Sequence, residues 1–178
     1  MDKPIERIAS FIRDVPDFPK KGIVFKDITP LLGAADAMKI ACDLMTEPFR
    51  RAGITKVVGL ESRGFIFGTP AAERLGVGFV PIRKPGKLPW KKERMSYSLE
   101  YGEDTIEIHA DAVGPRDKVL IVDDLLATGG TAAAAAALVE KLGAKVLGIT
   151  FLIELDFLRG RDKLKSHRVE SLIHYASE

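Results

Sequence analysis

The sequence predicts an α/β protein with a central, mostly parallel sheet flanked by helices. Three apolar runs rich in β-branched residues, at 56–60, 77–82 and 119–122, suit strands that are buried on both faces. The first and third runs are each followed by a polar loop with glycine and then by a helical pattern, at 65–75 and 132–140. This repeated order is typical of an open parallel sheet, in which ligands bind at the carboxyl ends of the strands.

Length and composition set limits on the class of protein. The 178 residues suffice for one sizeable core, so we expect a single domain over residues 1–178. The 27 basic and 25 acidic residues leave a formal charge of +2, which gives no reason to expect a nucleic-acid or membrane partner. Cys42, the single cysteine, lies on the apolar face of a predicted helix and fits a reducing cytoplasm. The sequence shows neither a signal peptide nor an apolar stretch of about 18 residues, so we expect a cytoplasmic location.

The N-terminal third begins with an amphipathic helix predicted over residues 4–13. Prolines and a glycine then interrupt residues 16–30 and leave a short extended piece at 23–25. This segment is either a wrapping loop that buries Phe18 and Phe25, or a lip on which Phe25 stacks against a flat heterocycle. The residues alone favour the wrapping loop.

A second helix is predicted over residues 34–52, with Gly53 placed to end it. The strand at 56–60 then leads into the loop of Glu61, Ser62, Arg63 and Gly64. This loop lies at the ligand edge of the sheet and could hold an anionic group such as a pyrophosphate. Alternatively, Arg63 is a solvated surface arginine.

Residues 83–96 form a basic segment with six basic residues against one acid. Two prolines and a glycine break any regular pattern, which predicts a flexible loop that closes over a polyphosphate and excludes water. A solvated charge run, or an RNA-contacting loop with Trp90 as a stacking platform, is the alternative. Residues 97–109 alternate as two short antiparallel strands that turn near 102–104. Glu100 lies on them, and its position does not distinguish a catalytic carboxylate from a solvated one.

The most informative stretch is VLIVDDLLATGGT at 119–131, where a buried strand ends in charge and a glycine loop precedes a helix. Neighbouring side chains on an extended backbone point opposite ways, so one of Asp123 and Asp124 can reach a ligand while the other faces the scaffold. Free N–H groups at the following helix N-terminus favour a phosphate. The spacing GxxxxGK[ST] is absent, and acids beside a phosphate cradle suit a sugar phosphate. The alternative is an ordinary acidic turn with a glycine N-cap.

Towards the C-terminus, the helix ends at Gly143 and a long strand is predicted at 145–155. A short helical turn and a final strand at about 169–174 complete the chain. The three histidines are scattered without metal-ligand spacing, and we assign no chemistry to them: His109, His167 and His174.

Several stretches together resemble the adenine phosphoribosyltransferase family of the type I phosphoribosyltransferases, from one end of the chain to the other. They are PDFPKKGIVFKDITPLL, ESRGFIFG, IRKPGKLPW, YSLEYG, VDDLLATGGT and IELDFLRGR. The resemblance implies the type I fold with a small hood and a flexible basic loop. It also implies transfer of the 5-phosphoribosyl group from 5-phosphoribosyl 1-diphosphate (PRPP) to adenine, giving AMP and pyrophosphate in purine salvage. Mg²⁺ bound through PRPP, with no direct protein ligand, and a homodimer are implied as well.

The resemblance assigns roles to individual residues. The ribose and 5′-phosphate of PRPP would be bound by Asp123, Asp124, Ala127, Thr128, Gly129, Gly130 and Thr131. Pyrophosphate would be bound by Glu61, Ser62, Arg63, Arg83, Lys84 and Lys87, often with a cis peptide before the serine. Adenine would be bound by Val24, Phe25, Lys26 and Leu155. The catalytic residues would be Glu100, Arg63, Lys84 and Lys87.

Two departures from the family pattern are visible, because Glu61 and Lys26 stand where aspartate and arginine are common. Both are mild if the two residues act through backbone geometry. A phosphoribosyltransferase for another base stays open as an alternative. A PRPP-sensing regulator of transcription or RNA stays open too, although this chain has neither the added DNA-binding domain nor the basic face usual in such regulators.

Overall fold

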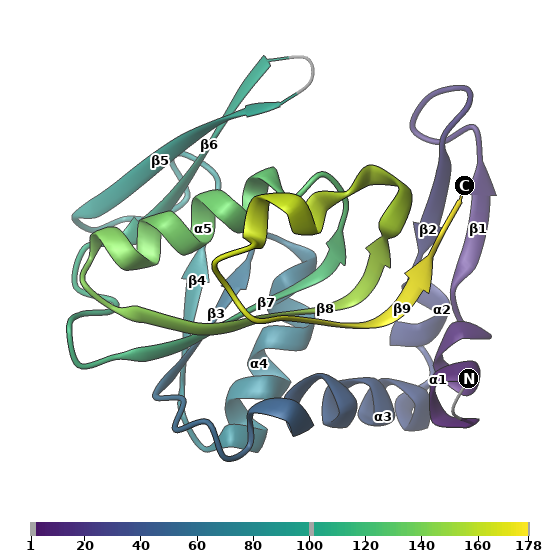
Figure 1. Cartoon of the computed structure of the whole chain (residues 1–178), viewed down its shortest axis with the longest axis horizontal. Helices are drawn as coiled ribbons and strands as arrows, with labels where there is room; N and C mark the ends of the chain where they lie inside the picture. The colour runs from purple at the N-terminus through teal and green to yellow at the C-terminus, as the bar shows by residue number, and fades with distance from the viewer. Residues whose placement is uncertain (1–2, 100–101, 178) are drawn as a thin grey trace.

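A computed structural model describes residues 3–99 and 102–177 and shows a five-stranded parallel sheet in the order β4-β3-β7-β8-β9 (Figure 1). Each neighbouring pair in this sheet is parallel, as the apolar runs predicted. The strands of this sheet are β3 (Lys56–Leu60), β4 (Gly78–Ile82), β7 (Lys118–Leu126), β8 (Lys145–Leu155) and β9 (Val169–Tyr175). The predicted fold class is therefore confirmed.

Helices cover both faces of this sheet and create two apolar cores. The α-helices are α1 (Lys3–Ala9), α2 (Thr29–Leu32), α3 (Ala35–Thr46), α4 (Arg63–Leu75) and α5 (Gly130–Lys141). Side chains on β7 alternate between the cores: Val119 and Ile121 pack with α5, whereas Leu120 and Val122 pack with α3 and α4. The central strand is thus buried on both faces, which explains its unbroken apolar run.

Two hairpins and three short 3-10 helices complete the described chain. The hairpins pair β1 (Arg13–Pro16) with β2 (Val24–Asp27), and β5 (Lys92–Leu99) with β6 (Gly102–His109). The β5-β6 hairpin projects away from the sheet, whereas the β1-β2 hairpin lies beside β9, near both ends of the chain (Figure 1). The 3-10 helices are η1 (Glu47–Phe49), η2 (Asp156–Leu158) and η3 (Gly160–Leu164). No helix in the described ranges is long and apolar enough to cross a membrane.

The N-terminal region differs from its prediction. The helix predicted to residue 13 ends at Ala9, because the backbone from Arg13 onwards pairs with β2. An ion pair across the hairpin, between Arg13 Nη2 and Asp27 Oδ2 at 2.6 Å, supports this pairing. The wrapping-loop interpretation is wrong for Phe18, whose side chain is 51% exposed. Phe25 is half-buried.

The second predicted helix is also shorter than expected. Pro48 follows the end of α3 and leaves only the 3-10 turn η1, so the chain is no longer α-helical well before Gly53. Cys42 lies in α3 and is buried in the core, as predicted. Desolvation raises the pKa of its thiol to about 11.

Three further boundaries were wrong. The strand predicted at 119–122 continues through both aspartates to Leu126, because β8 supplies pairing partners along this length. The basic segment predicted as a flexible loop over 83–96 is irregular only to residue 91, because β5 begins at Lys92. Residues 102–104 belong to strand β6, in which Gly102 is opposite Leu99, and not to the predicted turn.

The contact between β8 and η1 yields a stability prediction. A Cβ atom at Gly148 would lie 2.2 Å from Cε1 of Phe49, a ring that is only 1% exposed. Gly148→Ala should therefore lower the free energy of unfolding by about 1 to 3 kcal/mol through overpacking, as measured by urea denaturation. Gly114→Ala is the control, because its Cβ would meet nothing within 4 Å and should be neutral or stabilising by up to about 1 kcal/mol. Equal stability of the two variants would contradict the close packing of Gly148 against Phe49.

Candidate active site

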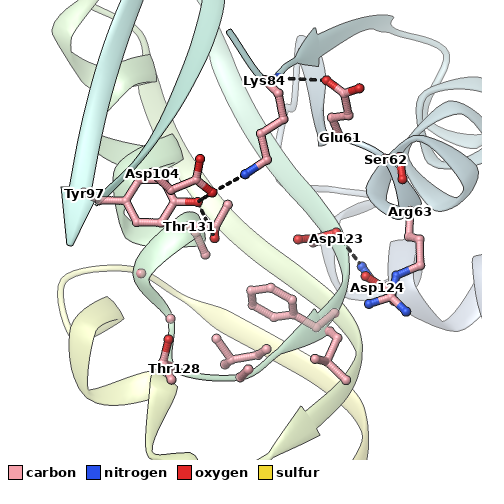
Figure 2. A pocket seen from close by; sticks show the side chains of 17 residues that line it. Glu61, Ser62, Arg63, Lys84, Tyr97, Asp104, Asp123, Asp124, Thr128 and Thr131 are labelled. Atoms are coloured by element: carbon pink, nitrogen blue, oxygen red, sulfur yellow. Dashed lines mark hydrogen bonds and ion pairs between the residues drawn. The ribbon is translucent and has the colours of Figure 1, made fainter. Parts of the chain in front are cut away.

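A cavity of about 280 Å³ lies at the carboxyl ends of β3 and β7, where the N-termini of α4 and α5 face the β5-β6 hairpin (Figure 2). Because parallel strands end at the same edge of a sheet, the two predicted loops meet here. The lining residues are Glu61, Ser62, Arg63, Lys84, Tyr97, Asp104, Asp123, Asp124, Leu125, Leu126, Ala127, Thr128, Gly129, Gly130, Thr131, Ala132 and Phe151.

The paired aspartates of β7 have different surroundings. Asp124 is 4% exposed and its Oδ2 lies 2.9 Å from Nε of Arg63, in the first turn of α4. Asp123 points into the open part of the cavity (Figure 2), and its Oδ1 accepts the backbone N–H of Asp124 at 2.9 Å. Arg63 is thus paired with Asp124 and is not a solvated surface arginine.

Desolvation and mutual repulsion raise the pKa of Asp123 well above its ordinary value. Desolvation also raises the pKa of Asp124, although the Arg63 guanidinium opposes this shift. Two neighbouring carboxylates that resist ionisation indicate a site prepared for positive charge or for hydroxyl donors.

The close approach of α4 to this pair depends on Gly64. A Cβ atom there would lie 2.7 Å from the carbonyl oxygen of Val122 and 2.9 Å from Oδ1 of Asp123. A side chain would therefore push the helix N-terminus, with Arg63, away from the acids.

The loop from Ala127 to Thr131 lies against η3 with backbone touching backbone. Gly129 has a φ of +75° and is the N-cap of α5; a Cβ atom there would lie 2.2 Å from the carbonyl oxygen of Gly160. Conversely, a Cβ atom at Gly160 would lie 2.1 Å from the carbonyl oxygen of Ala127. The first N–H groups of α5 lack intrahelical partners and, with the helix dipole, favour an anion at this loop.

The loop after β3 contains a cis peptide between Glu61 and Ser62, as the family resemblance implied. Ser62 is the N-cap of α4, so a second helix N-terminus reaches the cavity. The Glu61 carboxylate accepts the Lys84 backbone N–H at 2.7 Å and pairs with Arg83 Nη2 at 3.0 Å. Burial alone would raise the pKa of Glu61, but these two bonds hold it below its ordinary value.

Some of the predicted pyrophosphate-binding residues line the cavity and others do not. Glu61, Ser62, Arg63 and Lys84 line the cavity, as do Asp123, Asp124 and the loop from Ala127 to Thr131. Arg83 is not among the lining residues, because its guanidinium is bound to Glu61; Lys87 is exposed and also lies outside the lining.

Two polar lining residues, Tyr97 and Asp104, were missed from the sequence. Nζ of Lys84 forms an ion pair with Asp104 of β6, and the Tyr97 hydroxyl donates to Oδ2 of Asp104 at 3.0 Å. The same hydroxyl lies 2.9 Å from Oγ1 of Thr131 (Figure 2). Tyr97 begins the YSLEYG stretch, which was a usable signal, whereas Asp104 was assigned to a turn.

The predicted adenine-binding residues lie beside the cavity and do not line it. Val24, Phe25 and Lys26 belong to β2, and Leu155 ends β8. The Arg63 guanidinium carbon lies 5.2 Å from the centre of the Phe25 ring and so links this segment to the acids. Phe25 also lines a separate hollow of about 240 Å³ with Val15, Phe18 and Asp27. Glu100 lies outside the residues that the structure describes.

The Lys26 side chain points away from this hollow. It is 4% exposed, with Nζ 2.8 Å from Oδ1 of Asp14 and 4.1 Å from the centre of the Tyr175 ring. Lys26 thus ties the β1-β2 hairpin to β9.

Comparison with known proteins gives the chain its family. A Phosphoribosyl transferase domain family model matches residues 31–173. Adenine phosphoribosyltransferase from Nitrosococcus oceani is 55% identical over 171 residues, which are 96% of this chain and 100% of that protein. The enzyme of the same name from Clostridium perfringens is 57% identical over 164 residues, 92% of this chain and 95% of that protein. The chain belongs to the adenine phosphoribosyltransferase family.

Solved structures agree with this family membership. The adenine phosphoribosyltransferase of Thermoanaerobacter pseudethanolicus superposes with a TM-score of 0.93 at 53% identity, covering 96% of this chain and 99% of that one. The Saccharomyces cerevisiae enzyme, solved with an iminoaltritol bisphosphate and adenine, superposes with a TM-score of 0.91 at 43% identity, covering 97% and 99%. The predicted family and enzyme class, a pentosyltransferase, are therefore confirmed.

In this family member, one histidine joins an acidic cluster at the end of β8. Nδ1 of His174 lies 2.9 Å from Oδ1 of Asp156, and Glu154 is near enough that the three could offer ligands to a metal ion. However, Arg161 binds both carboxylate oxygens of Glu154, at 2.9 and 2.6 Å. This guanidinium already satisfies the carboxylate, so we assign the cluster a structural role.

The raised pKa of Asp123 gives a pH-dependent prediction. In the unfolded chain this carboxyl ionises near its ordinary value of 3.8, whereas the folded protein keeps the proton to higher pH. Wild-type stability therefore falls as pH rises from about 4 through the folded-state pKa, by about 1.4 kcal/mol per unit of difference. Asp123→Asn removes this loss and keeps the Oδ1 acceptor, so the variant should unfold at higher urea concentration than wild type at pH 7. The two midpoints should converge near pH 4.

A matched control is Asp111→Asn, which neutralises an exposed aspartate. Its difference from wild type should not grow between pH 4 and pH 7. An Asp123→Asn variant that is less stable than wild type at pH 7 would contradict the predicted sign.

Proposed function

We propose that the chain transfers the 5-phosphoribosyl group of PRPP to adenine, giving AMP and pyrophosphate, and that it does so in the cavity at the ends of β3 and β7. One observation carries the proposal: two helix N-termini face one cavity with a pair of acids between them. This arrangement matches a substrate with phosphates at both ends and a ribose in the middle. The names of the relatives and the family membership support the same reaction.

We place the 5′-phosphate of PRPP on the loop from Ala127 to Thr131, at the N-terminus of α5. The ribose hydroxyls donate to Asp123 and Asp124, whose oxygens are acceptors when ionised. The pyrophosphate lies towards Ser62, Arg63 and Lys84, at the N-terminus of α4. The cavity therefore holds the leaving group and the 5′-phosphate against helices on opposite faces of the sheet.

The protein's contribution to the reaction is electrostatic. Displacement at C1′ develops positive charge on the ribose and negative charge on the departing pyrophosphate. The aspartate pair stabilises the first charge, while Arg63, Lys84 and the α4 dipole stabilise the second. Glu100 is proposed to face the imidazole side of adenine and to assist the proton shift as N9 attacks C1′.

Arg83 and Lys87 were expected to add charge directly to the leaving group. We now propose that Arg83 acts indirectly, by holding Glu61 and with it the loop after β3. Lys87 lies in the irregular segment at 83–91 and would reach pyrophosphate only if that segment closed over the cavity.

Mg²⁺ bound through PRPP is part of the proposal, because the cavity is itself acidic. Among the described lining residues, four are carboxylates and two are cations: Glu61, Asp104, Asp123 and Asp124 against Arg63 and Lys84. A polyanionic substrate entering this lining needs additional positive charge, and phosphate oxygens are ligands that Mg²⁺ prefers. When bound, the ion would neutralise part of the pyrophosphate charge.

Removal of Mg²⁺ should therefore reduce turnover by at least about 100-fold, since both substrate binding and leaving-group stabilisation depend on that charge. The measurement is AMP formation from adenine and PRPP with excess EDTA. Added Mg²⁺ should restore the rate, whereas the same concentration of K⁺ should not. Full activity in EDTA would remove Mg²⁺ from the proposal.

The preference for adenine over other purine bases is proposed to come from hydrogen bonds to the main chain of β2. If Val24 to Lys26 lies along the base, a backbone C=O accepts from the 6-amino group of adenine and a backbone N–H donates to N1. Hypoxanthine reverses both groups and would leave buried partners unpaired, at about 1 to 3 kcal/mol each. We expect kcat/KM for adenine to exceed that for hypoxanthine by at least roughly 100-fold. Comparable values in purified wild type would overturn adenine specificity.

Two variants of Phe25 distinguish recognition of the base by main-chain hydrogen bonds from stacking of the base on the Phe25 ring. Phe25→Ala should raise KM for adenine by removing the stacking face, yet should keep the preference over hypoxanthine, because the reading atoms are main chain. Phe25→Tyr keeps the face and should stay close to wild type.

Three expectations complete the proposal. We expect a single domain and a cytoplasmic location, as the sequence analysis predicted. We also expect a homodimer, supported by Ile66 of the ESRGFIFG stretch, which is 37% exposed. Light scattering would distinguish two chains of 19.5 kDa from one.

A further inference from the structure

We infer that Asp104 is an internal counter-anion whose carboxylate competes with the phosphate oxygens of PRPP and pyrophosphate for Lys84. On this hypothesis Asp104 weakens the binding of both substrate and product. Their affinities therefore depend on Asp104 as well as on the residues that bind them. The inference rests on the proposed function, because it concerns the same cavity.

The first support is the position of the ion pair. Among the described residues that line the cavity, Lys84 is the one lysine, and its Nζ is paired with Oδ2 of Asp104 (Figure 2). The two side chains are 42% and 27% exposed, so the pair lies where solvent and a ligand can both reach it. Exposed ion pairs contribute little net energy and exchange partners readily. A phosphate oxygen entering the cavity could therefore displace the carboxylate, but only by competing with it.

The second support is the direction of the hydrogen bonds. The Tyr97 hydroxyl has one proton, which it donates to Oδ2 of Asp104 at 3.0 Å. In its 2.9 Å contact with Tyr97, the Thr131 hydroxyl must then be the donor. Asp104 thus orients the proton of Thr131 towards Tyr97 and away from the proposed 5′-phosphate position. The Asp104 carboxylate therefore engages hydrogen-bond donors on both sides of the cavity. It binds Lys84 directly and affects Thr131 through Tyr97.

Both members of the Lys84–Asp104 pair are ionised at neutral pH. Burial alone would raise the pKa of Asp104, but bonds from Lys84, from the Thr105 backbone N–H and from Tyr97 bring it below its ordinary value. The pKa of Lys84 is raised by the same pairing, against the opposing effect of burial. Asp104 therefore stays ionised at neutral pH and adds a full negative charge to a cavity that already contains Glu61 and the aspartate pair.

The opposite role is also physically possible: Asp104 could hold Lys84 in the position that the substrate needs. The two roles predict opposite changes in affinity when the charge is removed. Asp104→Asn is the appropriate variant, because it keeps the shape and an acceptor for Tyr97 while it removes the charge that binds Lys84.

The experiment measures binding of PRPP and of pyrophosphate, each with Mg²⁺, by titration calorimetry at pH 7. Asp104→Asn should bind both about three- to fivefold more tightly than wild type, the upper part of the range expected for a partly exposed ion pair. Glu103→Gln is the matched control, since it removes the same charge one residue away, where the side chain is exposed and outside the lining. Its affinities should stay within about twofold of wild type.

A second pair of variants tests whether the gain acts through Lys84. In a Lys84→Met background, Asp104→Asn should improve affinity clearly less than it does in the wild-type background, because no lysine remains to be freed and only the loss of repulsion and the release of Thr131 remain. Circular dichroism and thermal melting check folding, and Asp104→Ser takes the place of Asp104→Asn if that variant is unfolded.

The outcomes separate the two hypotheses. If wild type binds neither PRPP nor pyrophosphate, the proposed function fails. If wild type binds them and Asp104→Asn binds equally or more weakly, the proposed function survives and the inference is overturned. A gain in affinity that is as large in the Lys84→Met background as in the wild-type background also overturns the inference.

Discussion

The structure depends on keeping two adjacent carboxylates at the end of a buried strand. Asp123 and Asp124 are desolvated and repel each other, which costs free energy that the rest of the fold must offset. The offset comes from burial of β7 between β3 and β8, with an apolar core on each face. Arg63 compensates one charge, and it can do so only because Gly64 lets α4 approach the strand. The free energy gained by burying the sheet thus offsets the cost of keeping two desolvated carboxylates side by side.

The parallel sheet also explains how one cavity can contact both ends of an elongated substrate. α4 follows β3 and covers one face, while α5 follows β7 and covers the other. Their N-termini nevertheless meet, because both follow strands that end at the same edge. The β5-β6 hairpin closes a third side, through Tyr97 and Asp104. The phosphate-binding groups are therefore fixed by helices, and the hairpin adds side chains that can change partners.

Much of this was predictable from sequence, for identifiable reasons. The strands at 56–60 and 145–155 have the predicted bounds, because burial on both faces leaves a mostly apolar run. The loops that line the cavity were located by their glycines and charges. Contacts between distant residues left no such signal: Thr131 meets Tyr97 across 34 residues, and Arg83 binds Glu61 across 22. The first contact, with the bond from Tyr97 to Asp104 beside it, explains why two polar lining residues were missed, and the second keeps Arg83 out of the lining. The pairing of β1 with β2, with its ion pair between Arg13 and Asp27, likewise joins residues that periodicity does not connect.

The burial of Cys42 has a practical consequence for observing this protein at work. A thiol with a pKa of about 11, enclosed in the core, carries almost no thiolate at neutral pH and is closed to bulky maleimide reagents. The chain has no other cysteine. A cysteine introduced at an exposed position, such as Trp90, would therefore accept a fluorophore without background labelling. Fluorescence could then report directly on any movement of the basic segment relative to the cavity.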